Sequence, residues 1–250
     1  VIGQSIGILQ SMRIQQAAGL NGNRYATFHQ LGKEQAQKLH EDDRLYDVGD
    51  TIFIGSTPLG NSSLSLYLRE YHDNALSMYP AIGNVKEGRL PEEAIEIALS
   101  EDALQYLGLD AVIGDTVSLD LSVSVMDGSL SELEYSADFV LTGILESSYI
   151  GYASGTVEGI VGEGTAEELL PEEYLLYSTD FKTYDKQNFQ SIIYALAEDL
   201  NVDERYIQYN WVLLDAIGIS YDEAADSDTG TGFSFMTAAC ILVGVLVLLA

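Results

Sequence analysis

The side chains that could do chemistry in this chain are three histidines, one cysteine and many paired carboxylates. His29, His40 and His72 are far apart in sequence, and none has another ligand at the spacing of a metal-binding motif. The spacing therefore predicts no metal site. Cys240 is the only cysteine and lies in an apolar run, so no disulfide can form within the chain.

Acidic pairs could supply the two carboxylates of a glycoside hydrolase, and they occur at 92–93, 167–168 and 172–173. The chain has 39 acidic residues, so such pairs arise by chance and solvated surface is the better interpretation. No G-x-S-x-G nucleophile turn occurs, and the segment 162–167 lacks the Gly-Lys-Ser/Thr end of a phosphate-binding loop. We predict a chain that is not an enzyme, and the sequence identifies no catalytic, cofactor-binding or substrate-binding residue.

The formal net charge of −28 excludes one class of partner. Only 11 residues are Lys or Arg, and binding to nucleic acid or anionic lipid depends on such residues to neutralise phosphate. We therefore expect no nucleic-acid binding. The acidic residues and the 16 tyrosines could form a surface for cationic amphipathic peptides, but packing of strands by tyrosine and solubility from the acidic residues are the better explanation.

Both ends of the chain are apolar. Residues 233–250 carry no charge and reach the lower limit for a membrane-crossing helix, with a buried helix of a soluble core as the alternative. Residues 1–9 are mostly apolar and lead into a polar, helix-compatible segment. We expect a piece of a longer protein, in which 1–21 is the outer end of a first transmembrane helix with a stalk and 233–250 starts a second. The region from about 22 to 230 would then form an ectodomain.

The residues between these ends predict an α+β fold. Apolar periodicity indicates two β-α-β units, whose elements are strand 24–31, helix 33–42 and strand 48–54, then strand 173–179, helix 185–201 and strand 206–214. In the second helix, Asp185 is the expected N-cap and Asn201 the expected stop. Two such units form a split, ferredoxin-like sheet with two helices on one face.

The segment between the two units predicts an inserted β-rich lobe. Strict alternation over 116–125, an Asp-Gly turn and a return strand over 132–146 predict a hairpin, and Ser100 caps a short helix over 100–109. Residues 148–167 are glycine-rich and predict a flexible connection with at most one short strand. The expected domains are one lobe made of 22–80 and 165–217, an inserted lobe over 81–164 and a linker over 218–232.

The middle segment also carries a motif. Residues 88–119, followed by 139–145, resemble the extracytoplasmic core domain of ABC transporter permeases of the MacB and FtsX type. The matching residues are Gly88, Arg89, Pro91, Glu96, Ile97, Leu99, Ser100, Leu107, Gly108, Gly114, Asp115, Val117, Gly143 and Ile144. The resemblance also covers the layout, because such permeases have one long ectodomain between their first and second transmembrane helices.

Residue by residue, this motif has a structural explanation. Gly88, Gly108 and Gly114 suit tight turns or positive φ, Pro91 fixes the entry to a turn, and Asp115 can accept a backbone N–H before a strand. We therefore expect these residues to shape the fold and not to perform chemistry.

The resemblance implies a permease subunit in a bacterial plasma membrane, with an extracellular or periplasmic ectodomain. Such permeases dimerise and pair with a cytoplasmic ATPase, so the cofactor ATP would be used by the partner to export or expel a peptide, drug or lipid-linked substrate. Two alternatives stay open: an FtsX-like regulator that activates an exterior cell-wall hydrolase, and an anchored binding or sensor module. Residues 11–18 contain no Gly or Pro, so we expect motion to pass through the N-terminal helix.

Overall fold

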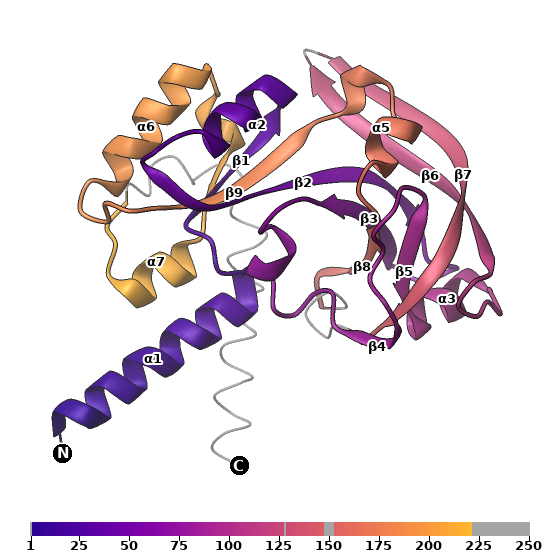
Figure 1. The fold of residues 1–250 in the computed structure, drawn as a ribbon, viewed down its shortest axis with the longest axis horizontal. Coiled ribbons are helices and arrows are strands. Elements are labelled where there is room, and N and C mark those ends of the chain that lie inside the picture. The colour runs from indigo at the N-terminus through magenta and orange to yellow at the C-terminus, as the bar shows by residue number, and fades with distance from the viewer. Residues whose placement is uncertain (1, 128, 148–152, 222–250) are drawn as a thin grey trace.

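The computed structural model describes residues 2–127, 129–147 and 153–221 (Figure 1). Its strands are β1 (Ala26–Leu31), β2 (Leu45–Pro58), β3 (Ser65–Tyr71), β4 (Val85–Gly88), β5 (Glu96–Ser100), β6 (Thr116–Asp127), β7 (Ser129–Leu145), β8 (Thr156–Val161), β9 (Tyr177–Thr183) and β10 (Ile207–Tyr209). Its α-helices are α1 (Ile2–Asn21), α2 (Lys33–His40), α3 (Glu101–Leu107), α5 (Thr165–Leu169), α6 (Phe189–Leu200) and α7 (Trp211–Ile217).

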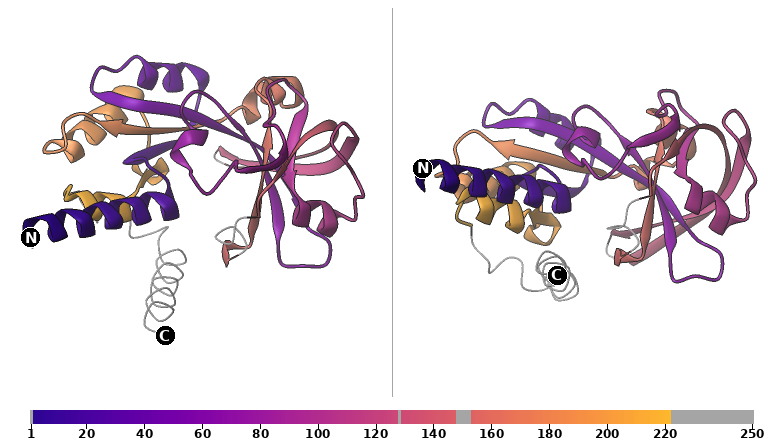
Figure 2. Two further views of the ribbon diagram at one scale, coloured as in Figure 1. Left: turned by 60° about the horizontal axis from the view of Figure 1, so that its bottom comes forward. Right: turned by 90° about the horizontal axis from the view of Figure 1, so that it is seen from below.

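One lobe is the expected split β-α-β sheet. Its strand order is β10-β1-β9-β2, and each neighbouring pair is antiparallel. The helices α2 and α6 cross over within β1-α2-β2 and β9-α6-β10, and α1 and α7 lie on the opposite side of the lobe (Figures 1 and 2). The α+β fold class and the ferredoxin-like arrangement are therefore confirmed.

The core of this lobe follows from the apolar periodicity of its elements. Helix α6 buries Phe189, Ile193, Leu196 and Leu200, which recur at the spacing of one helical face. Phe28 and Phe181 from neighbouring strands meet edge to face, with ring centroids 5.2 Å apart. Asn201 ends α6 in the left-handed conformation, as predicted.

The long strand β2 joins the two lobes into one sheet. Its first half pairs with β9, from Leu45 to Ile52, and its second half pairs with β3, from Thr51 to Pro58. The pairings continue from β3 to β8, β5, β7 and β6, and a Ser56–Ser122 pair returns from β6 to β2. The strands β3, β5, β6, β7 and β8 therefore form a closed ring with β2, which they share with the first lobe (Figure 1). We call this ring the inserted lobe, and it includes β3, which lies before the expected start at residue 81.

The predicted hairpin is confirmed as β6 and β7, and its alternation sets the burial. Val117, Leu119, Leu121 and Val123 are each at most 4% exposed, whereas the residues between them face outward. The turn residue at 128 lies outside the described residues.

In the second β-α-β unit, three element boundaries differ from the prediction. The strand expected over 206–214 ends at Tyr209, because Asn210 caps α7 by accepting the N–H of Leu213. The strand expected from residue 173 begins at Tyr177, after a 3-10 turn. Asp185 does not cap α6: it accepts the N–H groups of two turn residues, and the helix begins four residues later.

The connection expected over 148–167 contains the one short strand that the prediction allowed, and an unpredicted helix begins near its end. Thr156–Val161 forms β8 inside the sheet, parallel to β3 and antiparallel to β5, and Thr165–Leu169 forms α5. A strand with neighbours on both edges is fixed by backbone hydrogen bonds and needs little apolar periodicity of its own. Gly159 fits there because a Cβ would lie 2.6 Å from a Leu68 methyl carbon.

Among the helices within the described ranges, none is long and apolar enough to cross a membrane. Helix α1 nevertheless runs without a break from Ile2 to Asn21, as the absence of Gly and Pro over 11–18 predicts. The predicted linker over 218–232 lies largely outside the described residues, as does the whole apolar run 233–250.

Candidate functional site

The junction where helix α1 enters the domain is the candidate functional site. The helix ends at Asn21, and Gly22 turns the chain at φ 85° while its N–H donates to Ala18. The next N–H, from Asn23, donates to the carbonyl of Met78 over 2.6 Å, and that of Tyr25 donates to Phe181 over 3.0 Å. The chain is thus bound into the domain within a few residues of the helix end.

Asn210, from the C-terminal part of the chain, holds the same junction by hydrogen bonds. Its side-chain Nδ2 donates to the carbonyls of Gly22 and Arg24, both over 2.8 Å, and its N–H donates to Tyr25 over 3.0 Å. The residue is 1% exposed, so each of these bonds is shielded from water. Because Asn210 also caps α7, the start of α7 and the end of α1 are held together.

A buried ion pair completes the junction. Arg24 Nε lies 3.1 Å from Asp180 Oδ1 and donates to the Tyr79 hydroxyl over 2.9 Å, and that hydroxyl donates to Asp180 Oδ2 over 2.7 Å. Burial raises the pKa of Asp180, while Arg24 and the hydroxyls of Thr27 and Tyr79 favour its charged form. Removing one partner of such a pair costs about 3–5 kcal/mol. The junction is therefore stiff because most of its polar groups are buried and paired, although Arg24 Nη1 makes no hydrogen bond within the described residues.

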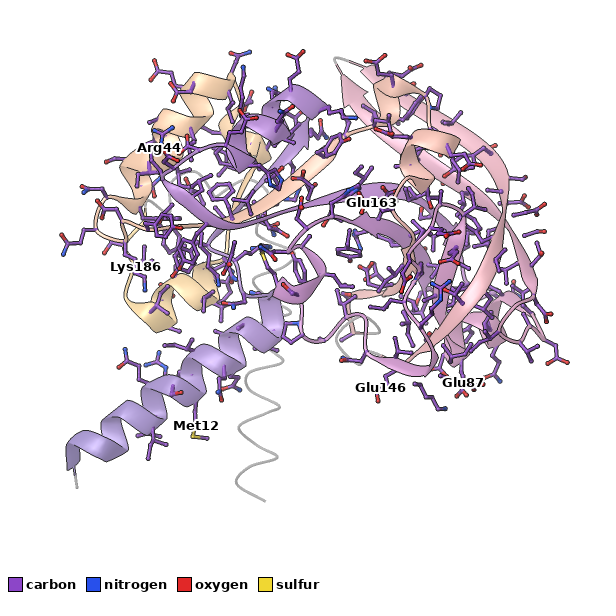
Figure 3. All side chains as sticks on the ribbon, viewed as in Figure 1. Met12, Arg44, Glu87, Glu146, Glu163 and Lys186 are labelled. Atoms are coloured by element: carbon purple, nitrogen blue, oxygen red, sulfur yellow. The ribbon has the colours of Figure 1, made fainter. Side chains whose placement is uncertain are left out.

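Beyond the junction, α1 projects away from the domain. Its inner end packs against α7 and buries Ala17, whereas Ile8, Leu9 and Met12 are about 60% exposed (Figures 2 and 3). A helix fixed at one end and free along most of its length can act on the domain as a lever. The arrangement is mechanical and brings no reactive group together.

The motif residues Arg89 and Glu96 form one ion pair. The Arg89 guanidinium donates to both carboxylate oxygens over 2.8 and 2.6 Å, and Glu96 Oε2 also accepts the N–H groups of Glu92 and Glu93. The pairing with Arg89 and the two backbone N–H groups lower the pKa of Glu96 to about 2. This ion pair closes the turn that contains Pro91.

The motif glycines allow two close backbone approaches. Gly88, at φ 78°, pairs with Gly143 where β4 meets β7. A Cβ on Gly88 would lie 2.3 Å from the Thr142 carbonyl oxygen, and one on Gly143 would lie 2.2 Å from that of Arg89. Only glycine fits either position.

The remaining motif positions are also structural. Ser100 caps α3 by accepting the N–H of Ala103, and Gly108 ends it at φ 72°. Asp115 accepts the N–H of Val112 over 3.0 Å, and Gly114 has φ 97°. The structural roles expected for Gly88, Gly108, Gly114 and Asp115 are confirmed.

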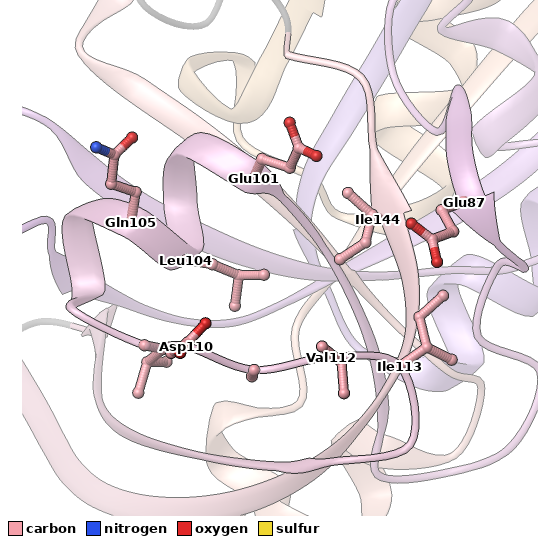
Figure 4. Close-up of a pocket in the computed structure, with 10 residues that line it drawn as sticks. Glu87, Glu101, Leu104, Gln105, Asp110, Val112, Ile113 and Ile144 are labelled. Atoms are coloured by element: carbon pink, nitrogen blue, oxygen red, sulfur yellow. The ribbon is translucent and has the colours of Figure 1, made fainter.

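A cavity of about 350 Å³ lies beside α3 in the inserted lobe (Figure 4). Apolar side chains and carboxylates share its wall, and the lining residues are Glu87, Glu101, Leu104, Gln105, Leu109, Asp110, Ala111, Val112, Ile113 and Ile144. Val112 is 65% exposed, and Lys86 Nζ donates to Glu101 over 2.7 Å. The cavity could bind a ligand in which an apolar group lies next to a positive charge, because its wall combines apolar side chains with carboxylates.

The fold separates His29 from the other two histidines. His29 on β1 bonds to Ser178 and Gln208, and burial lowers its pKa. His40 and His72 lie instead among carboxylates of β2 and β3 and of the segments that follow β3 and β8. Sequence spacing could not reveal this second grouping, because its members come from different elements.

No protein-family model matches the chain, and no curated protein matches it. Similar solved structures include one periplasmic and one extracellular domain. The periplasmic region of MacB from Actinobacillus actinomycetemcomitans is 15% identical with a TM-score of 0.48, covering 81% of this chain and 95% of that one. The extracellular domain of the noncanonic ABC-type transporter YknZ from Gram-positive bacteria is 12% identical with a TM-score of 0.48, covering 75% of this chain and 99% of that one. At these identities the likeness concerns the fold alone.

Proposed function

We propose that this chain is the ectodomain of a MacB/FtsX-type ABC transporter permease and moves when a partner subunit hydrolyses ATP. In this proposal the domain faces the extracellular or periplasmic side of a bacterial plasma membrane and works in a permease dimer. Its movement exports or expels a peptide, drug or lipid-linked substrate. The motif over 88–145 supports the family, and the described residues supply a mechanical part.

The observation that carries the proposal is the way α1 is fixed. A continuous helix enters the domain through buried hydrogen bonds and the Arg24–Asp180 ion pair. Rotation or tilting of such a helix must move the domain as well. The helix contains no Gly or Pro between Ser11 and Ala18, and the chain that follows it is bound to the domain. ATP-driven closure on the far side of the membrane could reach the ectodomain by this route.

The test is to insert Gly-Gly between Gln15 and Gln16 of the parent permease, reconstituted with its ATPase. An Ala-Ala insertion at the same point is the matched control, because it causes the same rotation and lengthening but keeps the helix stiff. We expect the Gly-Gly variant to hydrolyse ATP while losing transport relative to the Ala-Ala variant. Equal transport by the two variants would contradict the lever.

The cavity beside α3 favours one alternative, in which the domain grips an exterior hydrolase as an FtsX-like regulator. Its apolar wall lies open to solvent at Val112 and Ile113. Substituting Val112 with Glu would then abolish hydrolase activation. In the transport proposal, this exposed substitution leaves the coupling of ATP hydrolysis to transport unchanged.

A further inference from the structure

Three potential metal ligands converge where the two lobes meet. His40 ends α2, Asp50 lies on the shared strand β2, and Asp73 follows β3. One ligand atom from each lies within 4.8 Å of the other two. The three residues thus come from the first lobe, the shared strand and the inserted lobe respectively.

The distances suit a single small cation. His40 Nε2 lies 3.0 Å from Asp50 Oδ2 and 3.9 Å from Asp73 Oδ2. Ligands at about 2.0–2.1 Å from a tetrahedral zinc ion are roughly 3.4 Å apart, so the side chains need only small shifts. The Asp50 side chain is 9% exposed and its second oxygen accepts the Thr179 hydroxyl over 2.6 Å, which holds the carboxylate in place.

The charges around the three ligands also call for a cation. Glu70 and Glu163 lie beside His72, and Figure 3 labels Glu163 near the meeting of the lobes. Within the described ranges, the ion pairs of Asp50, Asp73, Glu70 and Glu163 involve only His40 or His72. Lys and Arg therefore provide no direct partner for these four carboxylates within the described ranges, although the buried Glu70 accepts the backbone N–H groups of Gly164 and Ala166.

A second observation comes from His72. Its backbone N–H donates to the Asp50 carbonyl over 2.8 Å, which places it against the same strand. Its Nε2 atom lies 2.7 Å from Glu70 Oε1, and its Nδ1 atom lies 3.4 Å from Glu163 Oε1. His72 therefore places the carboxylates of Glu70 and Glu163 beside the strand that carries Asp50.

We propose that His40 Nε2, Asp50 Oδ2 and Asp73 Oδ2 bind one transition-metal dication of the zinc class. An imidazole nitrogen among the ligands favours such an ion over Ca²⁺ or Mg²⁺, which prefer oxygen ligands throughout. Asp73 is 62% exposed, so the ion has access from solvent and can take water as a further ligand. The bound ion links α2 to the segment after β3 and fixes the two lobes relative to each other.

The test titrates the whole chain, stripped with EDTA, with ZnCl₂ in a calorimeter, in parallel with CaCl₂ and MgCl₂. We expect one equivalent of Zn²⁺ to bind, with Ca²⁺ and Mg²⁺ much weaker. At a hundredfold excess over Kd, Zn²⁺ should raise the melting temperature by roughly 5–10 °C. The Asp73→Asn variant should weaken Zn²⁺ binding at least about tenfold, and His40→Gln should do the same.

Asp43→Asn is the matched control, because it removes an exposed carboxylate from the turn after α2 and should leave Zn²⁺ binding unchanged. Asp73 is exposed, so its variant should melt like the wild type in EDTA. The proposal is overturned by the absence of saturable binding, by equal affinities of Asp73→Asn and the wild type, or by Ca²⁺ binding as tight as that of Zn²⁺. None of these results bears on transport, so the permease proposal stands or falls separately.

Discussion

Replacing Glu96 with Gln should destabilise the domain in a pH-dependent way. The pairing with Arg89 lowers the pKa of Glu96 from 4.5 to about 2, which corresponds to at most roughly 3.4 kcal/mol at 1.36 kcal/mol per pKa unit. Arg89 is 48% exposed, so solvent screening reduces this to about 2 kcal/mol. We expect Glu96→Gln to lose that much of the free energy of unfolding at pH 7.

The sign of the pH dependence follows from the lowered pKa. The folded state favours the charged carboxylate, so its contribution is present above about pH 4.5 and is lost as the pH falls towards 2. Urea unfolding of the wild type and Glu96→Gln between pH 7 and pH 2 measures the difference. Glu92→Gln, on the same turn, is the charge-matched control and should change stability by less than about 0.5 kcal/mol. A difference between wild type and Glu96→Gln that stays constant over this pH range would refute the reasoning.

Three further predictions concern the junction and the β4–β7 contact. Asp180→Asn leaves Arg24 buried without its charge partner and should cost about 3 kcal/mol in urea unfolding; a loss below 1 kcal/mol would contradict the buried pair. Asn210→Ala removes two hydrogen bonds to the α1 junction and the N-cap of α7, so thermal melting should show a loss of about 2–3 kcal/mol in the free energy of unfolding. An unchanged melting temperature would contradict the role of Asn210 in holding the junction together. Gly143→Ala meets a backbone oxygen and should destabilise by more than 2 kcal/mol, whereas Gly108→Ala meets nothing and should cost about 1 kcal/mol; equal losses would refute the close approach.

Much of the fold was predictable because local patterns agree with the global arrangement. The alternation over 116–125 and the apolar face of the helix over 189–200 each describe an element that is buried on one side. The order of these elements along the chain was enough to predict the split sheet. Ser100 and Asn201 also behave as predicted, because capping depends on nearby backbone groups.

The errors occur where distant residues determine the structure. The segment 206–214 is apolar enough for a strand, but Asn210 finds backbone partners at Gly22 and Arg24 and starts a helix there. Strand β8 has neighbours on both edges that lie far away in sequence, so its glycine-rich sequence predicts at most one short strand, and neither the place of that strand inside the sheet nor the helix α5 that follows it.

The junction itself was only half predictable. The uninterrupted helix follows from the lack of Gly and Pro over 11–18, whereas the Arg24–Asp180 pair joins residues more than 150 positions apart and leaves no local signal. The His40, Asp50 and Asp73 grouping is hidden for the same reason, since the spacing of metal ligands is informative only within one element or one turn.

The most direct test of the permease proposal is to purify the tagged full-length parent in detergent and identify its partners by mass spectrometry. The proposal predicts an ATPase with a G-x-x-x-x-G-K-[ST] phosphate-binding loop, either fused to the parent or present at equal stoichiometry. Recovery of exterior proteins alone, or of no partner, with no ATPase fused to the parent, would contradict the proposal and favour an anchored binding module.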